Sequence, residues 1–189
     1  DLDLARESSG AFDPTLGRVS QLWNLESDNP YIPSKSELTE LLLETGWEKI
    51  SLGDGEVFLK GGVQIDLGAV GKGIGCDEAR KMLEEADANA AVVSVGGSIL
   101  TYGKKPDGKP WKIGIANPRN EDGESYLGSL TIDGTCSIST SGDYEKYVIE
   151  DGVRYHHILD PKTGFPADSG LISVTIVCEK GWLSDGLST

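Results

Sequence analysis

Short segments rich in β-branched and aromatic residues recur along the chain, and glycine, proline, asparagine or aspartate bounds each of them. This spacing is typical of strands joined by tight turns. Asp151-Gly152, between two such segments, is a strong hairpin signal. The predicted strands are residues 56–60, 63–67, 90–95, 99–102, 111–115, 127–132, 147–150, 153–158 and 171–178. Because strands outnumber helices, the pattern predicts a single-domain α+β fold with a largely antiparallel sheet and a few helices.

Two segments have the periodicity of amphipathic helices. Residues 34–45 place three leucines on one face, with Ser34 or Ser36 as the N-cap. Residues 74–86 form the second predicted helix, directly after a glycine-rich stretch at 68–75. A glycine loop that opens into a helix N-terminus is a natural site for an anion.

The composition limits the classes of partner. The chain has 189 residues, which is enough for one domain with a sizeable core. Its formal net charge of −14 argues against nucleic acid, because phosphate backbones require basic surface. No segment has the length and hydropathy of a membrane span, and no signal peptide is visible. The 3 cysteines are widely spaced, so we expect buried small side chains rather than disulfides or a zinc site.

The glycine-rich stretch matches neither common phosphate-binding motif. A P-loop places Ser or Thr after its Gly-Lys pair, whereas Gly73 follows Lys72 here. A dinucleotide fingerprint would require glycine at the position of Cys76. The stretch is therefore either a close strand-to-helix packing turn or a functional loop, and a lysine among glycines favours the functional loop.

His156 and His157 are the only histidines, and they are adjacent. On a strand they would point to opposite faces, so together they cannot easily chelate one metal ion. One of them can serve as a general base, although a histidine with no catalytic role is the more common occurrence. Asp185 and residues 186–189 offer hard oxygen ligands for a divalent metal or, equally, a helix N-cap.

Further short motifs occur in a characteristic order along nearly the whole chain. They are Ser9-Gly10-Ala11-Phe12-Asp13-Pro14-Thr15 with Leu22-Trp23, Asp66-Leu67-Gly68-Ala69 with Gly71-Lys72-Gly73, Gly96-Gly97, Trp111 with Ile113-Gly114-Ile115 and Pro118, Ser141-Gly142-Asp143-Tyr144, His157-Ile158 with Asp160-Pro161, Thr163-Gly164 with Pro166, and Asp185 with Leu187-Ser188-Thr189. In order and spacing this set resembles the FAD:protein FMN transferases, the ApbE-like family. Each motif is weak alone, but the ordered set is specific.

The resemblance implies a transferase that binds FAD and Mg²⁺. Such enzymes cleave the pyrophosphate of FAD and attach FMN to a Thr or Ser hydroxyl of an acceptor protein, releasing AMP. The metal spreads the developing phosphoryl charge. By resemblance, the metal ligands are the Ala69 carbonyl, Asp185 and Thr189, with Ser188 close by.

The resemblance also implies roles for other side chains. His157 and Asp185 are the expected catalytic residues, with His157 as the base for the acceptor hydroxyl. Asp160 either orients His157 or holds the turn that follows it. The residues expected to contact FAD are Ala11, Phe12, Asp13, Asp66, Lys72 and Ile158.

Two features depart from the family pattern. Ser94 and Ser98 flank the double glycine, where family members often have Asn and Asp, so one carboxylate is missing. Family members also extend further at both ends, so residues 1–189 are expected to be a fragment of an ApbE-like flavin transferase domain. The resemblance implies an extracytoplasmic lipoprotein whose membrane anchor lies outside this chain, with a cytoplasmic location as the alternative.

Three other hypotheses stay open. An FAD pyrophosphatase would use the same site, with water in place of the acceptor hydroxyl. A non-catalytic flavin carrier, which Ser94 and Ser98 favour, would bind flavin without releasing AMP. A structural or interaction domain that has lost its ligand would not bind flavin at all.

Overall fold

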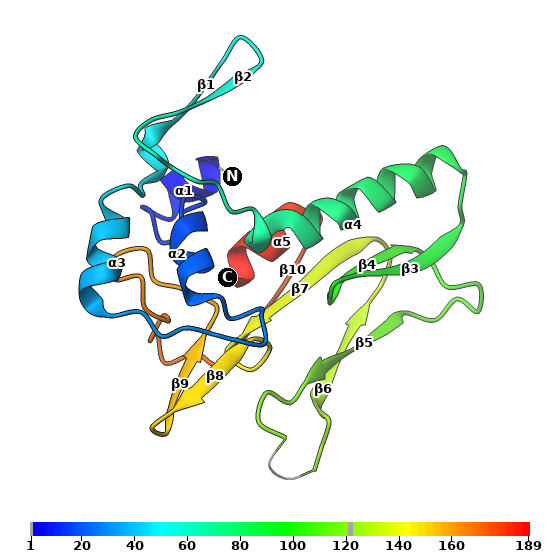
Figure 1. The fold of residues 1–189 in the computed structure, drawn as a ribbon. Helices are drawn as coiled ribbons and strands as arrows, with labels where there is room; N and C mark the ends of the chain where they lie inside the picture. The colour runs from blue at the N-terminus through cyan, green and yellow to red at the C-terminus, as the bar shows by residue number, and fades with distance from the viewer. Residues whose placement is uncertain (1, 121–122) are drawn as a thin grey trace. The chain divides into compact units, whose positions relative to one another are not determined.

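The computed structural model describes residues 2–120 and 123–189, and the chain divides into two compact units (Figure 1). The first unit is the chain up to Leu67 together with Asp143–Leu171. The second unit is Gly68–Gly142 together with Ile172–Thr189. Among the described residues, no helix combines the length and hydropathy that a membrane span requires.

Short helices and two hairpins make up the first unit. Its elements are α1 (Leu2–Glu7), α2 (Gly17–Trp23), α3 (Lys35–Leu42), the 3₁₀-helix η1 (Trp47–Lys49), β1 (Ile50–Gly53) paired with β2 (Glu56–Leu59), and β8 (Tyr147–Glu150) paired with β9 (Val153–His156). Trp23 is fully buried in the core, where its indole N–H donates to the Gly164 carbonyl at 2.7 Å. The rings of Tyr155 and Phe165 lie 5.6 and 5.8 Å from the Trp23 ring. This tryptophan therefore fixes the turn around Gly164 against helix α2.

The predicted cap at Ser34 is confirmed. Its hydroxyl accepts from the Glu37 amide at 3.3 Å, and the Glu37 carboxylate accepts from the Ser34 amide at 2.8 Å. The two bonds satisfy amides that a helix N-terminus leaves without partners.

Replacing Ser34 with alanine should therefore lower the free energy of unfolding by about 1 kcal/mol. Urea unfolding, followed by tryptophan fluorescence, measures the change. Ser36→Ala is the matched control, because Ser36 lies inside α3 and its hydroxyl contacts the Ser34 hydroxyl, at 3.0 Å, rather than an amide of the helix. Equal destabilisation by the two changes would contradict the capping role of Ser34.

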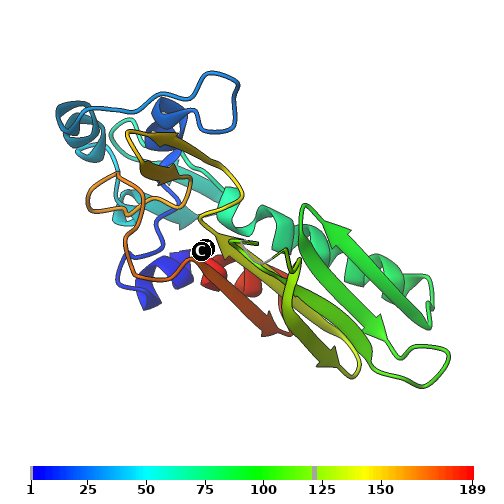
Figure 2. The same ribbon diagram turned by 90° about the horizontal axis from the view of Figure 1, so that it is seen from below.

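The second unit is built on a four-stranded antiparallel sheet in the order β10-β7-β4-β3. Its elements are α4 (Gly68–Glu85), β3 (Ala90–Val95), β4 (Ser98–Gly103), β5 (Trp111–Ala116), β6 (Tyr126–Ile132), β7 (Cys136–Gly142), β10 (Ser173–Cys178) and α5 (Gly181–Ser188), with β5 and β6 forming a separate hairpin. Helices α4 and α5 pack against each other and against the sheet, α4 over β3 and β4 and α5 over β7 and β10 (Figure 2).

The predicted α+β class with mostly antiparallel strands is confirmed. Most of the predicted strands are present to within a few residues, and the two predicted helices are also found. The two compact units do not decide whether the chain is one domain, so the single-domain assignment stays a prediction.

The strand predicted at residues 63–67 is wrong. This segment makes one isolated parallel bridge, between Gln64 and Leu16, and the Asp66 amide donates to the Pro14 carbonyl at 2.8 Å. Its neighbour is thus the segment before α2. Since Pro14 has no N–H, that segment cannot continue a ladder of hydrogen bonds.

The predicted start of the second helix is also wrong. Helix α4 begins at Gly68, so the glycines after it form its first turns rather than a loop before it. At Gly73 the helix requires glycine, because a Cβ atom there would lie only 2.0 Å from the Gly181 carbonyl oxygen of α5. The glycines thus allow two helix backbones to touch, and the expectation of a loop before the helix is wrong.

Candidate active site

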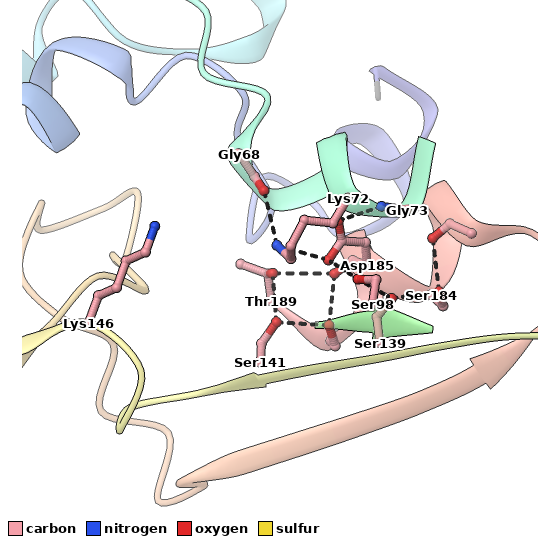
Figure 3. Close-up of polar contacts among 12 residues, drawn as sticks. Gly68, Lys72, Gly73, Ser98, Ser139, Ser141, Lys146, Ser184, Asp185 and Thr189 are labelled. Carbon is pink, nitrogen blue, oxygen red and sulfur yellow. Dashed lines mark hydrogen bonds and ion pairs between the residues drawn. The ribbon is translucent and has the colours of Figure 1, made fainter. Parts of the chain in front are cut away.

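Asp185 lies on helix α5 among the polar contacts drawn in Figure 3. It is the most deeply buried charged group among the described residues, with no exposed side-chain area. Its Oδ2 atom accepts from the Gly73 amide at 2.9 Å. Its Oδ1 atom lies 3.2 Å from the Lys72 ammonium and accepts from the Ser98 hydroxyl at 3.5 Å. Asp185 lies inside α5, so its interpretation as a helix N-cap is wrong. The backbone amide that it does accept from belongs to another helix.

Lys72 supplies the cation that compensates this buried carboxylate. Its side chain is 33% exposed, and its ammonium also donates to the Gly68 carbonyl at 3.3 Å. The aliphatic part of Lys72 lies against Gly96, where a Cβ atom would come within 3.1 Å of Lys72 Cδ. Gly96 and Gly97 both have positive φ, which suits the two-residue turn between β3 and β4. The double glycine thus serves both the turn and the position of Lys72.

Hydroxyl groups link Asp185 to the middle of the sheet. The Ser98 hydroxyl, which donates to Asp185, accepts from Ser139 of β7 at 3.0 Å. Ser139 also lies 2.9 Å from the Ser184 hydroxyl, which donates to the Gly181 carbonyl. These three serines are almost completely buried. Because each hydroxyl can donate and accept, this series of hydroxyl groups gives buried polar atoms hydrogen-bond partners without adding charge.

A second set of hydroxyls surrounds the end of helix α5. Ser141 of β7 lies 2.8 Å from the Ser188 hydroxyl and 3.1 Å from the Thr189 hydroxyl. Ser188 and Thr189 both donate to the main-chain carbonyl of Asp185, at 2.9 and 3.3 Å. The carboxylate and hydroxyl oxygens of the predicted metal-binding segment therefore lie in one small region of the second unit.

The donor set fits a hard divalent cation. Among residues 2–120 and 123–189 there is no cluster of three or more His, Cys, Asp or Glu side chains that could hold a metal. Mg²⁺, however, usually takes one or two carboxylates and fills its other positions with neutral or substrate oxygens. One buried carboxylate, now balanced by a lysine ammonium, is consistent with that preference.

The predicted FAD-contacting residues other than Lys72 lie in the first unit. Ala11 is exposed and Phe12 is buried. The Asp13 carboxylate accepts from the Thr15 amide at 2.9 Å and from the Trp47 amide at 3.2 Å, so it holds its own loop together. Asp66 is half-buried.

The two histidines have different surroundings. His156 Nε2 lies 3.2 Å from the Ala167 carbonyl, and burial lowers the pKa of His156. Its Nδ1 atom is buried with no hydrogen-bond partner in the part of the chain that the structure describes. His157 Nδ1 lies 3.3 Å from the Lys146 carbonyl. The two rings therefore contact different carbonyls.

The residues after His157 form a tight turn. The Asp160 carboxylate accepts from the Lys162 amide at 2.9 Å and from the Thr163 hydroxyl at 3.2 Å. The Ile158 carbonyl accepts from the Ala167 amide at 2.9 Å. Of the two roles considered for Asp160, these contacts support holding the turn.

The three cysteines are free thiols. Burial raises the pKa of the Cys76 thiol to about 11, so the group remains protonated at neutral pH. Cys76 is buried, as predicted, whereas Cys136 and Cys178 are only half-buried.

Sequence reasoning missed Ser139 and Ser184. The signal available for Ser139 was the alternation of serines at 137, 139 and 141, which has the period of a strand.

Of the two departures from the family pattern, Ser98 contacts Asp185, whereas Ser94 is exposed.

Comparisons with known proteins give a consistent result. The model of the ApbE family matches residues 2–189. The FAD:protein FMN transferase of Treponema pallidum is 34% identical over 204 residues, covering 100% of this chain and 56% of that protein. A crystal structure of the ApbE protein of Thermotoga maritima is 40% identical with a TM-score of 0.90, covering 99% of this chain and 60% of that one.

The apo flavinyl transferase ApbE of Pseudomonas stutzeri is 31% identical, with a TM-score of 0.84 and coverage of 99% and 58%. The chain spans about half the length of the curated relatives that it matches.

Proposed function

Because this chain belongs to the ApbE family, we propose that it carries out Mg²⁺-dependent transfer of FMN from FAD to a Thr or Ser hydroxyl of an acceptor protein, with release of AMP. The observation that carries the proposal is the buried Asp185 carboxylate, which faces a lysine ammonium and neighbouring hydroxyls. Relatives named FAD:protein FMN transferase support the same reaction.

The proposed metal ligands are Asp185, Thr189 and the Ala69 carbonyl. In a regular helix, the Gly73 amide would bond to the carbonyl of Ala69, four residues earlier. The bond from Gly73 to Asp185 competes for that hydrogen and leaves the Ala69 carbonyl more available to a cation. A bound Mg²⁺ ion would neutralise charge that develops on the phosphoryl oxygens.

Lys72 is proposed to have two positions. Without metal, its ammonium neutralises Asp185. A divalent ion at Asp185 would repel this ammonium, and the flexible, half-exposed side chain can then contact a phosphate oxygen of FAD. This role agrees with the predicted contact between Lys72 and FAD.

His157 is the proposed base. If its Nδ1–H donates to the Lys146 carbonyl, the lone pair of the ring lies on Nε2. Nε2 then takes the proton of the acceptor hydroxyl while that oxygen forms a bond to the FMN phosphorus. The bond from this phosphorus to the AMP oxygen breaks, and AMP leaves with the electron pair.

The remaining assignments are proposals of the same kind. Contacts of FAD with Ala11, Phe12, Asp13, Asp66 and Ile158 rest on the family resemblance. So do the Ser/Thr motif of the acceptor and the extracytoplasmic, lipid-anchored location.

A single incubation tests the reaction. The protein that carries this chain is mixed with FAD, Mg²⁺ and an acceptor protein, and AMP release and acceptor mass are followed. We expect an FMN-sized mass gain that EDTA prevents. His157→Ala should slow transfer by about 100-fold or more, the usual contribution of a general base. His156→Ala is the matched control and should retain transfer, because His156 is proposed to have no catalytic role.

Other outcomes point to other functions. Release of AMP without a mass gain, whatever the acceptor, would indicate an FAD pyrophosphatase. Bound flavin without AMP release would indicate a carrier, and absence of flavin binding would indicate a domain without ligand. If His157→Ala leaves the rate of transfer unchanged, His157 is not the base.

A further inference from the structure

The two helices of the second unit are joined by a second aspartate, Asp77, which has no role in the reaction as proposed above. We propose that Asp77 is a positioning residue that holds Asp185 in place for cation binding. This inference rests on the proposed cation site at Asp185. It adds a residue that neither the sequence motifs nor the family resemblance singled out.

Asp77 caps helix α5 from the neighbouring helix. Its Oδ1 atom accepts from the Gly181 amide at 2.7 Å, and its Oδ2 atom accepts from the Trp182 amide at 2.9 Å. These amides belong to the first turn of α5, where a helix lacks internal partners for its N–H groups. Lys180, the residue at the N-cap position, provides no side-chain bond. Helix α5 thus depends on α4 for its cap.

The bonding between the helices is reciprocal. Asp77 follows Gly73 by four residues on α4, and Asp185 follows Gly181 by four residues on α5. Asp77 accepts from the Gly181 amide, and Asp185 accepts from the Gly73 amide. Between these two bonds the glycine backbones touch, since a Cβ atom at Gly181 would lie 2.2 Å from the Gly73 carbonyl oxygen. The same Gly-x-x-x-Asp pattern thus connects the helices in both directions.

The two aspartates nevertheless differ in what they leave for a ligand. Asp77 uses both carboxylate oxygens on backbone amides. Asp185 uses only Oδ2 in this way, and its Oδ1 faces Lys72 and Ser98. Asp77 therefore has a structural role. The Oδ1 atom of Asp185 faces a partly exposed lysine that can move away, so this oxygen can bind a metal ion in the proposed site. The reciprocal pair therefore consists of one anchor and one ligand.

The position of Asp185 follows from this anchor. Helix α5 spans only eight residues, and Asp185 lies four residues, or about 6 Å along the axis, after the capped amide of Gly181. Without the cap, the first turn of so short a helix can fray or shift. Substitution of a residue that orients a metal ligand typically lowers the metal affinity by about 10- to 100-fold.

Manganese binding to the metal-free protein tests the proposal without relying on catalysis. Mn²⁺ takes oxygen ligands as Mg²⁺ does, and its free concentration is measured by EPR. We expect Asp77→Ala to weaken Mn²⁺ binding by about tenfold. Asp77→Asn keeps one carbonyl oxygen for one of the two amides, so it should weaken binding less.

Two variants serve as controls. Glu78→Gln removes the same charge from the next position of α4, where the side chain is exposed and paired with Lys81. It should leave Mn²⁺ affinity unchanged. Ile113→Ala removes buried volume from strand β5, a part of the chain outside α4 and α5, and lowers stability, so it should also leave affinity unchanged. Equal weakening by Ile113→Ala would show that general destabilisation is the cause and would overturn the proposal.

Amide hydrogen exchange in the metal-free protein separates this proposal from the proposed function. Asp77→Asn should accelerate exchange at the first amides of α5 and also at Gly73, whose acceptor is Asp185. Acceleration at α5 alone, with full Mn²⁺ affinity, would make Asp77 a simple cap and reject its positioning role. If the unchanged protein binds no Mn²⁺, the cation site is wrong, while the exchange at Gly73 still decides whether Asp77 holds Asp185.

Discussion

Replacing Asp185 with asparagine should lower the rate of Mg²⁺-dependent AMP release from FAD by about a thousandfold or more. This factor corresponds to a loss of about 4 kcal/mol of transition-state stabilisation. The substitution keeps the shape of the side chain and an oxygen for the Gly73 amide. It removes the negative charge that attracts Lys72 and, in the proposed site, the metal. AMP production measured over a range of Mg²⁺ concentrations gives the result.

The protein should remain folded after this change. Lys72 is partly exposed, so water can solvate its ammonium once the carboxylate is gone. Asp133→Asn is a suitable control, because Asp133 also pairs with a lysine, Lys104, at 3.6 Å, but both partners are exposed. Retention of Mg²⁺-dependent AMP release by Asp185→Asn would contradict the metal-binding role of Asp185.

Replacing Gly73 with alanine should be the most destabilising of the substitutions considered. The new Cβ atom would lie 2.0 Å from the Gly181 carbonyl oxygen and 2.8 Å from the Asp185 Cβ atom. Neither the backbone of α5 nor this buried side chain can move aside without separating the helices. We expect a loss of about 3 kcal/mol or more in the free energy of unfolding, at the upper end for overpacking.

Gly71 provides a close control for this prediction. It lies in the same helix, two residues earlier, and a Cβ atom there would meet nothing within 4 Å. Gly71→Ala should therefore raise stability by up to about 1 kcal/mol, because alanine favours the helix. Thermal unfolding of the two variants measures the difference. Similar melting temperatures would mean that the close contact between α4 and α5 is not as described.

The sequence predicted those parts of the fold that have local signals. The β8–β9 hairpin has Asp151-Gly152 at its turn, and the capping box of α3 lies within four residues. Strand β7 was missed because serine and threonine predominate in it and no apolar alternation marks it. Its serines are buried because partners on β4 and α5 satisfy them, and those partners are distant in sequence.

For the candidate site, the sequence likewise predicted some residues and not others. Lys72 and Asp185 were expected to be functional, and the structure brings them to 3.2 Å of each other. Single-sequence patterns could not show that Gly73 is a helix contact rather than part of a loop. They also gave no sign of Asp77, because a cap supplied by another helix has no local motif. The chemical roles of the site residues remain predictions for the experiments above.

The ion pair of Lys72 with Asp185 also bears on how the protein is assembled. A chain that brings its own ammonium to a buried carboxylate carries an internal counter-ion, so folding need not wait for a metal. Proteins whose folding is driven by metal binding behave in the opposite way and unfold when the metal is chelated. If the proposed metal site is correct, loading would be an ion exchange, in which the lysine ammonium leaves the carboxylate as the divalent ion arrives. The metal affinity of the proposed site would accordingly be the difference between the interaction free energies of Asp185 with the metal and with Lys72, and the protein would stay folded when the metal leaves.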